Sequence, residues 1–171
     1  RPDRRAGLVR RWAGTAFRDL GLSVVIAFLI IVFLYQPVKV EGTSMMPSIG
    51  DQQRIFVDKF FFQIGISEIH RGDVVVFWFP KDQRVSYIKR VIGVPGDWIS
   101  VKSGQVRLNG RELREPYVPA EFRDEAEMPE IHLGKDEFFV LGDHRNSSND
   151  SRTWGPVPRE FIYGKAVFTY W

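Results

Sequence analysis

The sequence contains no cysteine and only three histidines. The missing thiols exclude disulfide bonds, thiol catalysis and thiolate metal sites, but they do not fix the compartment, because a domain of this size folds without such staples. The histidines lie far apart, at His70, His132 and His144, and do not have the spacing of a metal-ligand set. We therefore expect no metal and no cofactor.

The net positive charge is small and belongs to one end of the chain. The formal net charge is +3, and residues 1–20 alone carry six arginines against Asp3 and Asp19. The other 151 residues therefore sum to about −1. A nucleic-acid-binding domain carries a basic excess on its own surface. We accordingly expect no nucleic-acid partner, and we assign the arginines to a basic arm over residues 1–19.

One uninterrupted apolar run follows the arm, from Leu20 to Tyr35. Its sixteen residues are short for a spanning helix, where roughly 17–25 are usual, but its flanks extend it. We predict a helix over Arg18–Phe33 and a single transmembrane anchor over residues 20–37. A cleaved signal peptide is the alternative, but no small-x-small cleavage site follows Tyr35. The arginine excess predicts that the N-terminus is cytoplasmic and that the rest of the chain lies across the membrane.

Residues 38–171 are predicted to form one mainly antiparallel β domain, with a small hairpin and loop insertion at residues 98–135. The strands are indicated by runs of β-branched and aromatic residues between turn signals. They are expected at Val38–Val40, Arg54–Asp58, Asp73–Phe79, Val85–Val94, Asp97–Lys102, Gln105–Leu108, Arg111–Leu113, Asp136–Leu141 and Lys165–Trp171.

Three other segments have less regular patterns. Glu121–Glu130 is acidic and contains Pro129, so we expect an exposed loop. Phe60–Phe62 fits a core strand, with an apolar edge that dips into the membrane as the alternative. One helical turn is predicted near Pro158–Phe161.

Ser44 is the candidate nucleophile. It lies between Gly42 and Pro47, a few residues after the apolar run and thus close to the expected membrane surface. Gly42 lets another backbone approach, and Pro47 fixes its own φ, so the serine is held in place. Most serines after a glycine are only turn residues, however, and a serine attacks only when a base takes its proton.

Lys89 is the candidate base, since no histidine has an obvious triad context. Lysines on strands usually point to solvent, but this one has apolar neighbours. They are Val85, Tyr87, Ile88, Val91 and Ile92. Desolvation lowers a lysine pKa, and no acidic residue adjoins Lys89 in the sequence to oppose that shift. Ser44 and Lys89 together therefore predict a serine protease with a lysine base.

A third stretch, Gly142–Pro158, is rich in short polar residues. Such side chains bond neighbouring backbone groups and build a fixed loop. A surface turn is the simpler interpretation, but Trp154 and two prolines favour a packed loop.

Four segments, in this order, resemble those of bacterial type I signal peptidases, the enzymes that remove signal peptides from exported proteins. They are Gly42–Ser48, Arg71–Phe77, Lys89–Asp97 and Gly142–Pro158. The resemblance implies a Ser-Lys endopeptidase whose β domain has the coiled antiparallel sheet shared with LexA-type repressors. It also implies a single-pass protein of the bacterial cytoplasmic (inner) membrane, with its catalytic domain on the outer, periplasmic side. The implied partners are the signal peptides of exported pre-proteins and the lipid bilayer.

The resemblance also implies roles for individual residues. Ser44 would be the nucleophile and Lys89 the general base, with Ser148 hydrogen-bonded to the lysine. Supporting ion pairs would involve Asp143, Asp150, Arg90 and Arg152. An extended substrate would pair with Val38–Gly42 and Gln83–Ile88 and be cleaved after small residues in an Ala-x-Ala pattern. Its pocket would be walled by Val38, Val40, Met45, Ile49, Tyr87 and Ile88.

Two departures from the family pattern affect the site. Gly42 stands where some members place a serine hydroxyl at the oxyanion hole, so we expect backbone N–H donors, chiefly that of Ser44, to hold the oxyanion. His144 replaces a common asparagine, and we expect it to have no role in proton transfer.

Other interpretations remain open. A related Ser-Lys processing peptidase of organelle or conjugation type would carry the same motifs. A non-catalytic bitopic membrane adaptor would tolerate the loss of Ser44 and Lys89. A Ser-His-Asp hydrolase that uses His144 is a more distant alternative.

Overall fold

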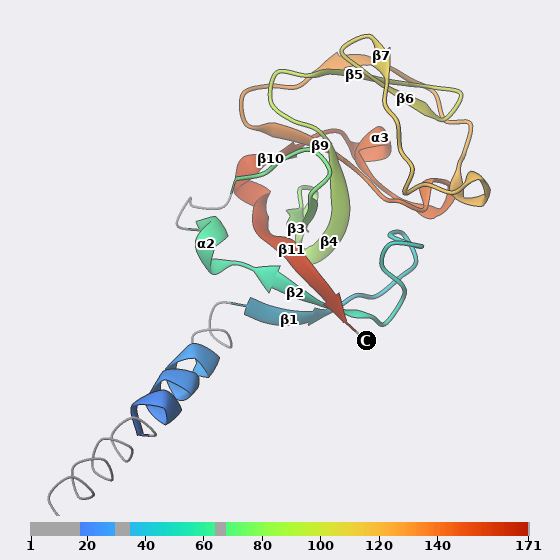
Figure 1. Ribbon diagram of the computed structural model, residues 1–171. Coiled ribbons are helices and arrows are strands. Elements are labelled where there is room, and N and C mark those ends of the chain that lie inside the picture. Colours follow the sequence, from blue (N-terminus) through green and yellow to red (C-terminus); the bar gives the residue numbers. More distant parts are fainter. Residues whose placement is uncertain (1–17, 30–34, 64–67, 171) are drawn as a thin grey trace, which may run out of the picture. The chain divides into compact units, whose positions relative to one another are not determined.

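The computed structural model of the chain describes residues 18–29, 35–63 and 68–170. Two compact units make up the chain, residues 1–35 and residues 36–171 (Figure 1). The second unit contains every strand except the first residue of β1, and it is the β domain that the sequence predicts.

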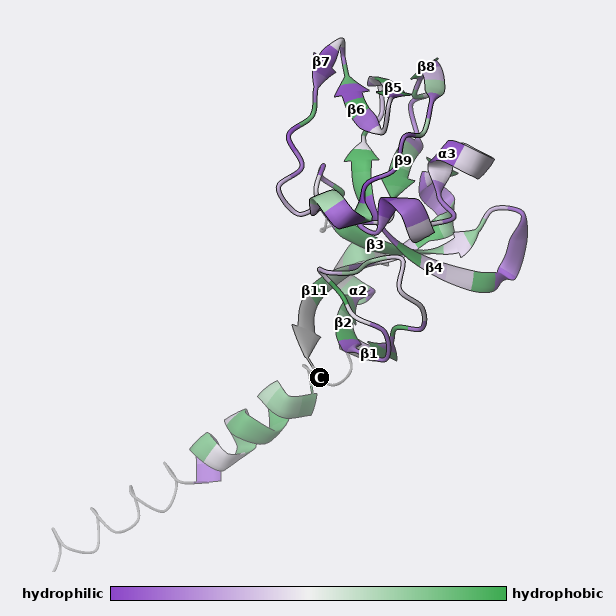
Figure 2. Ribbon diagram, turned by 90° about the vertical axis from the view of Figure 1, so that its right-hand side faces the viewer, coloured by the Kyte–Doolittle hydropathy of each residue, from purple (hydrophilic) through white to green (hydrophobic). Residues whose placement is uncertain are grey.

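Residues 18–29 of the first unit form an α-helix whose apolar side chains are exposed. The ribbon is largely hydrophobic along this helix and hydrophilic at its first residues (Figure 2). Among the described residues, no helix has the length and apolar character that crossing a membrane requires. The predicted helix continues to Phe33, but residues 30–34 lie outside the described part, as do residues 1–17 of the expected arm. Strand β1 begins at Tyr35, so the last residues of the predicted anchor are strand rather than helix.

Seven strands form the main sheet, in the spatial order β1-β2-β11-β3-β4-β9-β10. Each pair from β2 to β10 is antiparallel. In that order the strands are β1 (Tyr35–Lys39), β2 (Arg54–Asp58), β11 (Ile162–Tyr170), β3 (Val74–Phe79), β4 (Asp82–Gly93), β9 (Glu137–Leu141) and β10 (Val157–Pro158).

Four strands of the insertion form a second antiparallel sheet, in the order β7-β6-β5-β8. They are β7 (Arg111–Glu112), β6 (Gln105–Leu108), β5 (Trp98–Lys102) and β8 (Met128–His132). Both ribbon views place this small sheet at one end of the domain and β1 and β2 at the other (Figures 1 and 2). The mainly antiparallel β fold expected from the sequence is therefore confirmed.

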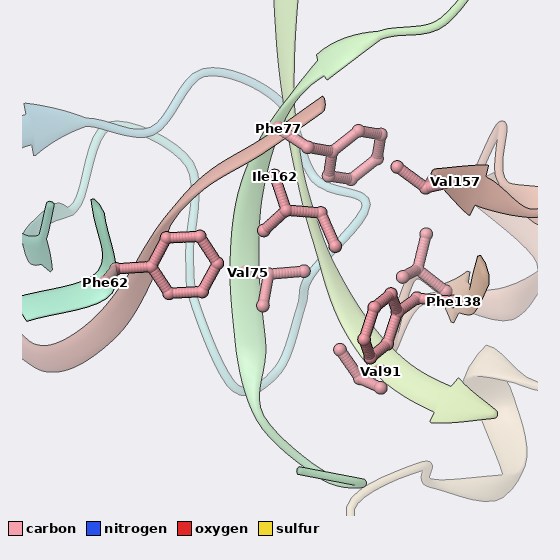
Figure 3. Close-up of a cluster of buried hydrophobic side chains, with 8 residues drawn as sticks. Phe62, Val75, Phe77, Val91, Phe138, Val157 and Ile162 are labelled. Atoms are coloured by element: carbon pink, nitrogen blue, oxygen red, sulfur yellow. The ribbon is translucent and has the colours of Figure 1, made fainter. Parts of the chain in front are cut away.

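Strand β3 contributes to two cores, because alternate residues of a strand point to opposite faces of its sheet. Val75 and Phe77 belong to a cluster shown in Figure 3. The other members of that cluster are Phe62, Val91, Phe138, Val140, Val157 and Ile162. Val76 points to the opposite face, into the cluster of Val40, Met45, Ile49, Ile55 and Val57. A third cluster joins the small sheet to β4 and β9.

Two segment predictions are wrong. Phe60–Phe62 is not a core strand but the start of a short helix, α2 (Phe60–Gln63), which buries Phe62 to 2% exposure and leaves Phe60 45% exposed. The acidic segment is not simply an exposed loop, because its last residues begin strand β8. Pro129 fits there because β8 is the edge strand of its sheet, where a missing N–H donor costs no ladder bond.

Short helices occupy several connections. The turn predicted near Pro158–Phe161 is confirmed as the 3-10 helix η3 (Arg159–Phe161). Three others were not predicted: η1 (Ala120–Phe122), η2 (Arg145–Ser147) and α3 (Ser151–Trp154). The carboxylate of Asp150 caps α3 by accepting from the N–H of Arg152, which is the ordinary role of aspartate at a helix start.

Candidate active site

Ser44 and Lys89 lie in hydrogen-bond contact, although 45 positions separate them in the sequence. Ser44 belongs to the turn between β1 and β2, and Lys89 lies in β4. The Ser44 Oγ and Lys89 Nζ atoms are 2.7 Å apart. Lys89 Nζ also donates to the carbonyl of Ile88, at 3.1 Å. A nucleophile and a base within hydrogen-bond reach are the arrangement that covalent catalysis requires.

The amine of Lys89 is almost fully removed from solvent, with only 3% of the residue exposed. Burial lowers the pKa of Lys89 from 10.5 to about 8, while the charges of Asp150 and Asp143 act in the opposite direction. No acidic residue adjoins Lys89 in the sequence, as noted above, but the fold brings these two distant carboxylates close enough to oppose the shift. Desolvation nevertheless outweighs them, since it penalises the charged amine directly.

The backbone around Ser44 is set by two neighbours. Gly42 has φ of 100°, a conformation that side chains rarely adopt, and its N–H donates to Asp51 Oδ1 at 2.8 Å. The Ser44 carbonyl accepts from the N–H of His144 at 3.1 Å. Within the described part of the chain, no acceptor bonds the N–H of Ser44. Positive φ thus explains the glycine at position 42, and the Ser44 N–H remains available to a substrate.

The four charged residues expected as supports form two ion pairs. Arg90 binds Asp143 through two contacts, Nε–Oδ1 at 2.8 Å and Nη2–Oδ2 at 2.6 Å. Arg152 binds Asp150 in the same way, with both contacts at 2.8 Å. Asp150 Oδ2 also accepts from the N–H of Gly142 at 3.1 Å. Both carboxylates are therefore held by fixed donors next to the Ser44–Lys89 pair.

Ser148 does not make the expected hydrogen bond to Lys89. Its Oγ is buried and has no hydrogen-bond partner among the described residues. It instead lies beside Gly142, where an added Cβ would be 2.2 Å from Ser148 Oγ and 2.5 Å from the Ser44 carbonyl oxygen. His144 contacts the same region, with Nδ1 3.1 Å from the Thr43 carbonyl oxygen and no contact to Ser44 Oγ.

A cleft of about 340 Å³ opens at Ser44 and Lys89. Val38, Val40, Tyr87 and Ile88 line it, as expected. Met45 and Ile49 do not line it, because they are buried to 1% and 4% exposure in the cluster beneath. Lys39, Glu41 and Ser86 also line it and lie within the two segments expected to pair with the substrate, whereas Ile55, Val76, Asn149 and Tyr163 were not expected there.

Two strand edges border this cleft. Strand β4 pairs with β9 only from Arg90 onward, so Gln83–Ile88 has β3 as its one neighbour in the described sheet. Strand β1 ends the main sheet on the other side. Unpaired strand edges accept an added extended peptide.

A third ion pair connects the insertion to the loop over Gly142–Pro158, called the catalytic loop below. Arg145 Nη1 donates to Glu115 Oε2 at 2.8 Å, and Arg145 Nε donates to the Gly142 carbonyl at 3.0 Å. The Tyr117 hydroxyl donates to Glu115 at 2.8 Å, and its ring lies 4.4 Å from the guanidinium carbon of Arg90. Sequence reasoning missed these residues because nothing in the local pattern indicates their long-range partners.

Comparison with known proteins identifies the family. The family model for signal peptidase, peptidase S26, matches residues 14–171. A signal peptidase I of Bacillus licheniformis is 38% identical over 159 residues, covering 87% of this chain and 83% of the relative. One from Leptolyngbya laminosa is 37% identical over 163 residues, covering 90% and 77%.

A solved structure agrees in fold. The crystal structure of a signal peptidase I from Enterococcus faecalis V583 matches with a TM-score of 0.51 and 24% identity, covering 58% of this chain and 97% of that one. These findings confirm the resemblance drawn from the four motifs and remove the reason to consider a non-catalytic adaptor. The chain belongs to the signal peptidase family, peptidase S26, and is a serine endopeptidase.

Proposed function

We propose that the protein removes N-terminal signal peptides from exported pre-proteins, with Ser44 as nucleophile and Lys89 as general base. The observation that carries this proposal is the 2.7 Å separation between Ser44 Oγ and Lys89 Nζ. The lowered pKa of Lys89, about 8, supports it. At that pKa about a tenth of the amine is neutral at pH 7, whereas an ordinary lysine is almost wholly protonated.

The neutral amine takes the proton of Ser44 while the hydroxyl oxygen attacks the scissile carbonyl. The resulting ammonium then gives a proton to the leaving amine, and water hydrolyses the acyl-enzyme with the same amine as base. The N–H of Ser44, which has no acceptor among the described residues, donates to the oxyanion. One such donor is worth roughly 3–4 kcal/mol in the transition state. Gly42 contributes the positive φ that this turn needs.

The substrate binds as an extended strand between Val38–Gly42 and Gln83–Ile88. An added strand satisfies the backbone of the peptide and sends alternate side chains onto one face. The apolar walls of the cleft leave room for small side chains at the residue before the scissile bond and two positions earlier, which gives the Ala-x-Ala preference.

The apolar segment over residues 20–37 anchors the protein in the bilayer as a single pass. The arginine-rich arm stays in the cytoplasm, since basic residues next to a membrane segment favour that side. The β domain then works on the outer side of the cytoplasmic membrane, where the cleavage sites of exported pre-proteins arrive.

The test is cleavage of a purified precursor that carries an Ala-x-Ala site. Wild type should release the mature protein, whereas Ser44→Ala and Lys89→Ala should release none while keeping the thermal unfolding of the wild type. Ser147→Ala and Lys102→Arg are matched controls, because both side chains are exposed and neither lines the cleft. Normal cleavage by either Ser44→Ala or Lys89→Ala would contradict the proposed mechanism.

A further inference from the structure

His144 contacts the two peptide units that flank the α-carbon of Ser44. Its backbone N–H donates at 3.1 Å to the Ser44 carbonyl, which belongs to the unit that follows. Its imidazole Nδ1 lies 3.1 Å from the Thr43 carbonyl oxygen, which belongs to the unit that precedes. One residue of the catalytic loop, distant from Ser44 in the sequence, therefore holds the backbone of the nucleophile on both sides.

The contact between His144 Nδ1 and Thr43 is a hydrogen bond that the imidazole donates. A carbonyl oxygen has no proton to give, so Nδ1 must carry the hydrogen. The neutral ring with its proton on Nδ1 and the imidazolium ion both meet this condition. The Met46 N–H donates to the same oxygen at 3.0 Å. The Thr43 carbonyl thus uses both of its lone pairs, and its direction is fixed by two donors.

The aromatic ring of Phe122 supports the imidazole in this position. Phe122 lies in η1 of the insertion, and its ring centroid is 4.2 Å from that of His144, at an interplanar angle of 53°. Tilted rings in contact attract each other, so Phe122 favours the side-chain conformation that reaches Thr43. Asn146 Nδ2 donates to the Glu121 carbonyl at 3.0 Å, which joins η1 to the same loop.

The Thr43–Ser44 peptide matters because its N–H is the oxyanion donor proposed for Ser44. The peptide is trans, so its C=O and N–H point in opposite directions within one plane. A donor that fixes the carbonyl therefore also fixes the direction of the N–H. Hydrogen bonds at the two ends of one amide also strengthen each other, because each polarises the group.

We propose that His144 is a positioning residue for the oxyanion hole, and that its Nδ1–H holds the Thr43–Ser44 peptide in the orientation that serves the oxyanion. This inference rests on the proposed function, since it needs Ser44 as nucleophile and its N–H as donor. His144 takes no proton in the reaction and acts only through the backbone of the serine turn. A side chain that donates from the same place should therefore replace it.

The experiment compares His144→Asn with His144→Leu in the full-length protein in detergent. Asparagine Nδ2 and histidine Nδ1 are both bonded to Cγ, so asparagine can donate from the same place, whereas leucine has no donor. We would measure kcat and KM on a peptide with an Ala-x-Ala site, and the inhibition constant of a peptide aldehyde with the same sequence. The aldehyde forms a tetrahedral adduct with Ser44 that engages the oxyanion donor as the transition state does.

His132→Leu is the matched control for His144→Leu. His132 is an exposed histidine that also contacts an aromatic ring, that of Trp98, with centroids 4.7 Å apart. It lies on the small sheet and does not line the cleft. Its replacement should leave kcat and the inhibition constant unchanged.

His144→Leu should lower kcat at least about tenfold with little change in KM, because full loss of one oxyanion donor costs about 10²–10³-fold and a misdirected donor keeps part of its effect. Its inhibition constant for the aldehyde should rise by a similar factor, which a smaller fraction of folded protein would not produce. His144→Asn should keep both quantities near the wild-type values. Because an amide side chain does not accept protons at these pH values, rescue by asparagine also excludes a general-base role for His144.

Wild-type kcat in folded His144→Leu overturns the proposal, as does an equal loss in His144→Leu and His144→Asn, or a lower kcat with an unchanged inhibition constant. If His144→Leu does not fold, His144→Asp takes its place, because ionised aspartate has the shape of asparagine but only accepts hydrogen bonds. Wild-type kcat in that variant overturns the proposal instead. A wild type that does not cleave the peptide, or a Ser44→Ala variant that does, contradicts the proposed function itself.

Discussion

Lys89 is subject to two opposing influences, and their balance sets the pH range in which the protein should work. Burial lowers the pKa of Lys89 to about 8, against the charges of Asp150 and Asp143. Only the neutral amine can accept the proton of Ser44, so activity must fall as pH drops below about 8. We expect kcat/KM to rise about tenfold from pH 7 to pH 9 and then level off, since the neutral fraction changes by that factor.

The variant that tests whether Lys89 is the base is Lys89→Arg, because the arginine side chain keeps its positive charge throughout this pH range. It should show no turnover at any pH between 6 and 10, with unfolding by circular dichroism like that of the wild type. A flat pH profile for the wild type, or measurable turnover by folded Lys89→Arg, would show that another group is the base.

The space beside Gly142 in the catalytic loop is too small for a side chain. An added Cβ would lie 2.2 Å from Ser148 Oγ and 2.5 Å from the Ser44 carbonyl oxygen, and contacts under 3.0 Å force something to move. Because Ser44 is one of the two groups in the way, Gly142→Ala should lower kcat at least about tenfold, given how strongly rates depend on small displacements of reacting groups.

Gly50→Ala is the matched control for Gly142→Ala. It lies in the same region of the chain as Ser44, and the nearest atom to its added Cβ belongs to the flexible Gln53 side chain, at 3.4 Å. We expect its kcat to stay near that of the wild type. Equal kcat in Gly142→Ala and Gly50→Ala would mean that the loop relaxes without moving Ser44.

At the scale of elements, the sequence pattern predicts most strands well. It predicts poorly the connections between them and the strands that depend on pairing. Strand β2 (Arg54–Asp58) and strand β6 (Gln105–Leu108) have the predicted bounds, since runs of β-branched residues between turns are a local signal. Strand β8 was missed because Met128–His132 is a strand only through its pairing with β5. Strand formation depends on such tertiary context more than on composition.

The same limit applies to the site. Ser44 and Lys89 stand out because each lies in a motif, and their pairing was expected from the resemblance to signal peptidases. Glu115 carries no local signal, because its contact is with Arg145, thirty positions away in the sequence. Residues that act through long-range contacts become visible only in the fold.

The ion pair between Glu115 and Arg145 joins the insertion to the catalytic loop. Their side chains are 6% and 3% exposed, so loss of one partner leaves a buried charge without compensation. Such losses cost about 3–5 kcal/mol, whereas replacing both partners by apolar residues of similar size is often neutral. Glu115→Met should therefore lower the free energy of unfolding by about that amount, and the double variant with Arg145→Met should recover most of it.

Urea unfolding of the single and double variants measures this coupling. Arg84→Ala is the control, because its ion pair with Asp82 lies on the surface and its loss should leave the unfolding free energy unchanged. If the double variant is as unstable as Glu115→Met alone, the pair is not the contact that stabilises this junction.

The two units of the chain differ in charge and in hydropathy. Six arginines lie in residues 1–20, ahead of the apolar segment, while the remaining 151 residues carry about −1. The candidate active site lies wholly within the second unit, in the turn after β1, strand β4 and the loop that begins at Gly142. The composition of the first unit fits the anchoring role proposed for it.

The difference in charge between the two units predicts how the chain is oriented in the membrane. Protease added outside spheroplasts that express the chain should digest residues 39–171, or at least the acidic segment, and spare residues 1–18, because basic residues are retained on the cytoplasmic side. Replacing the arginines of the arm by glutamine should raise the protected fraction of the β domain, and the same protease after detergent lysis should digest both ends. Immunoblots against tags at the two ends report the outcome. Protection of the whole chain in intact spheroplasts would contradict the orientation, since Ser44 would then lie on the side where the arginines are.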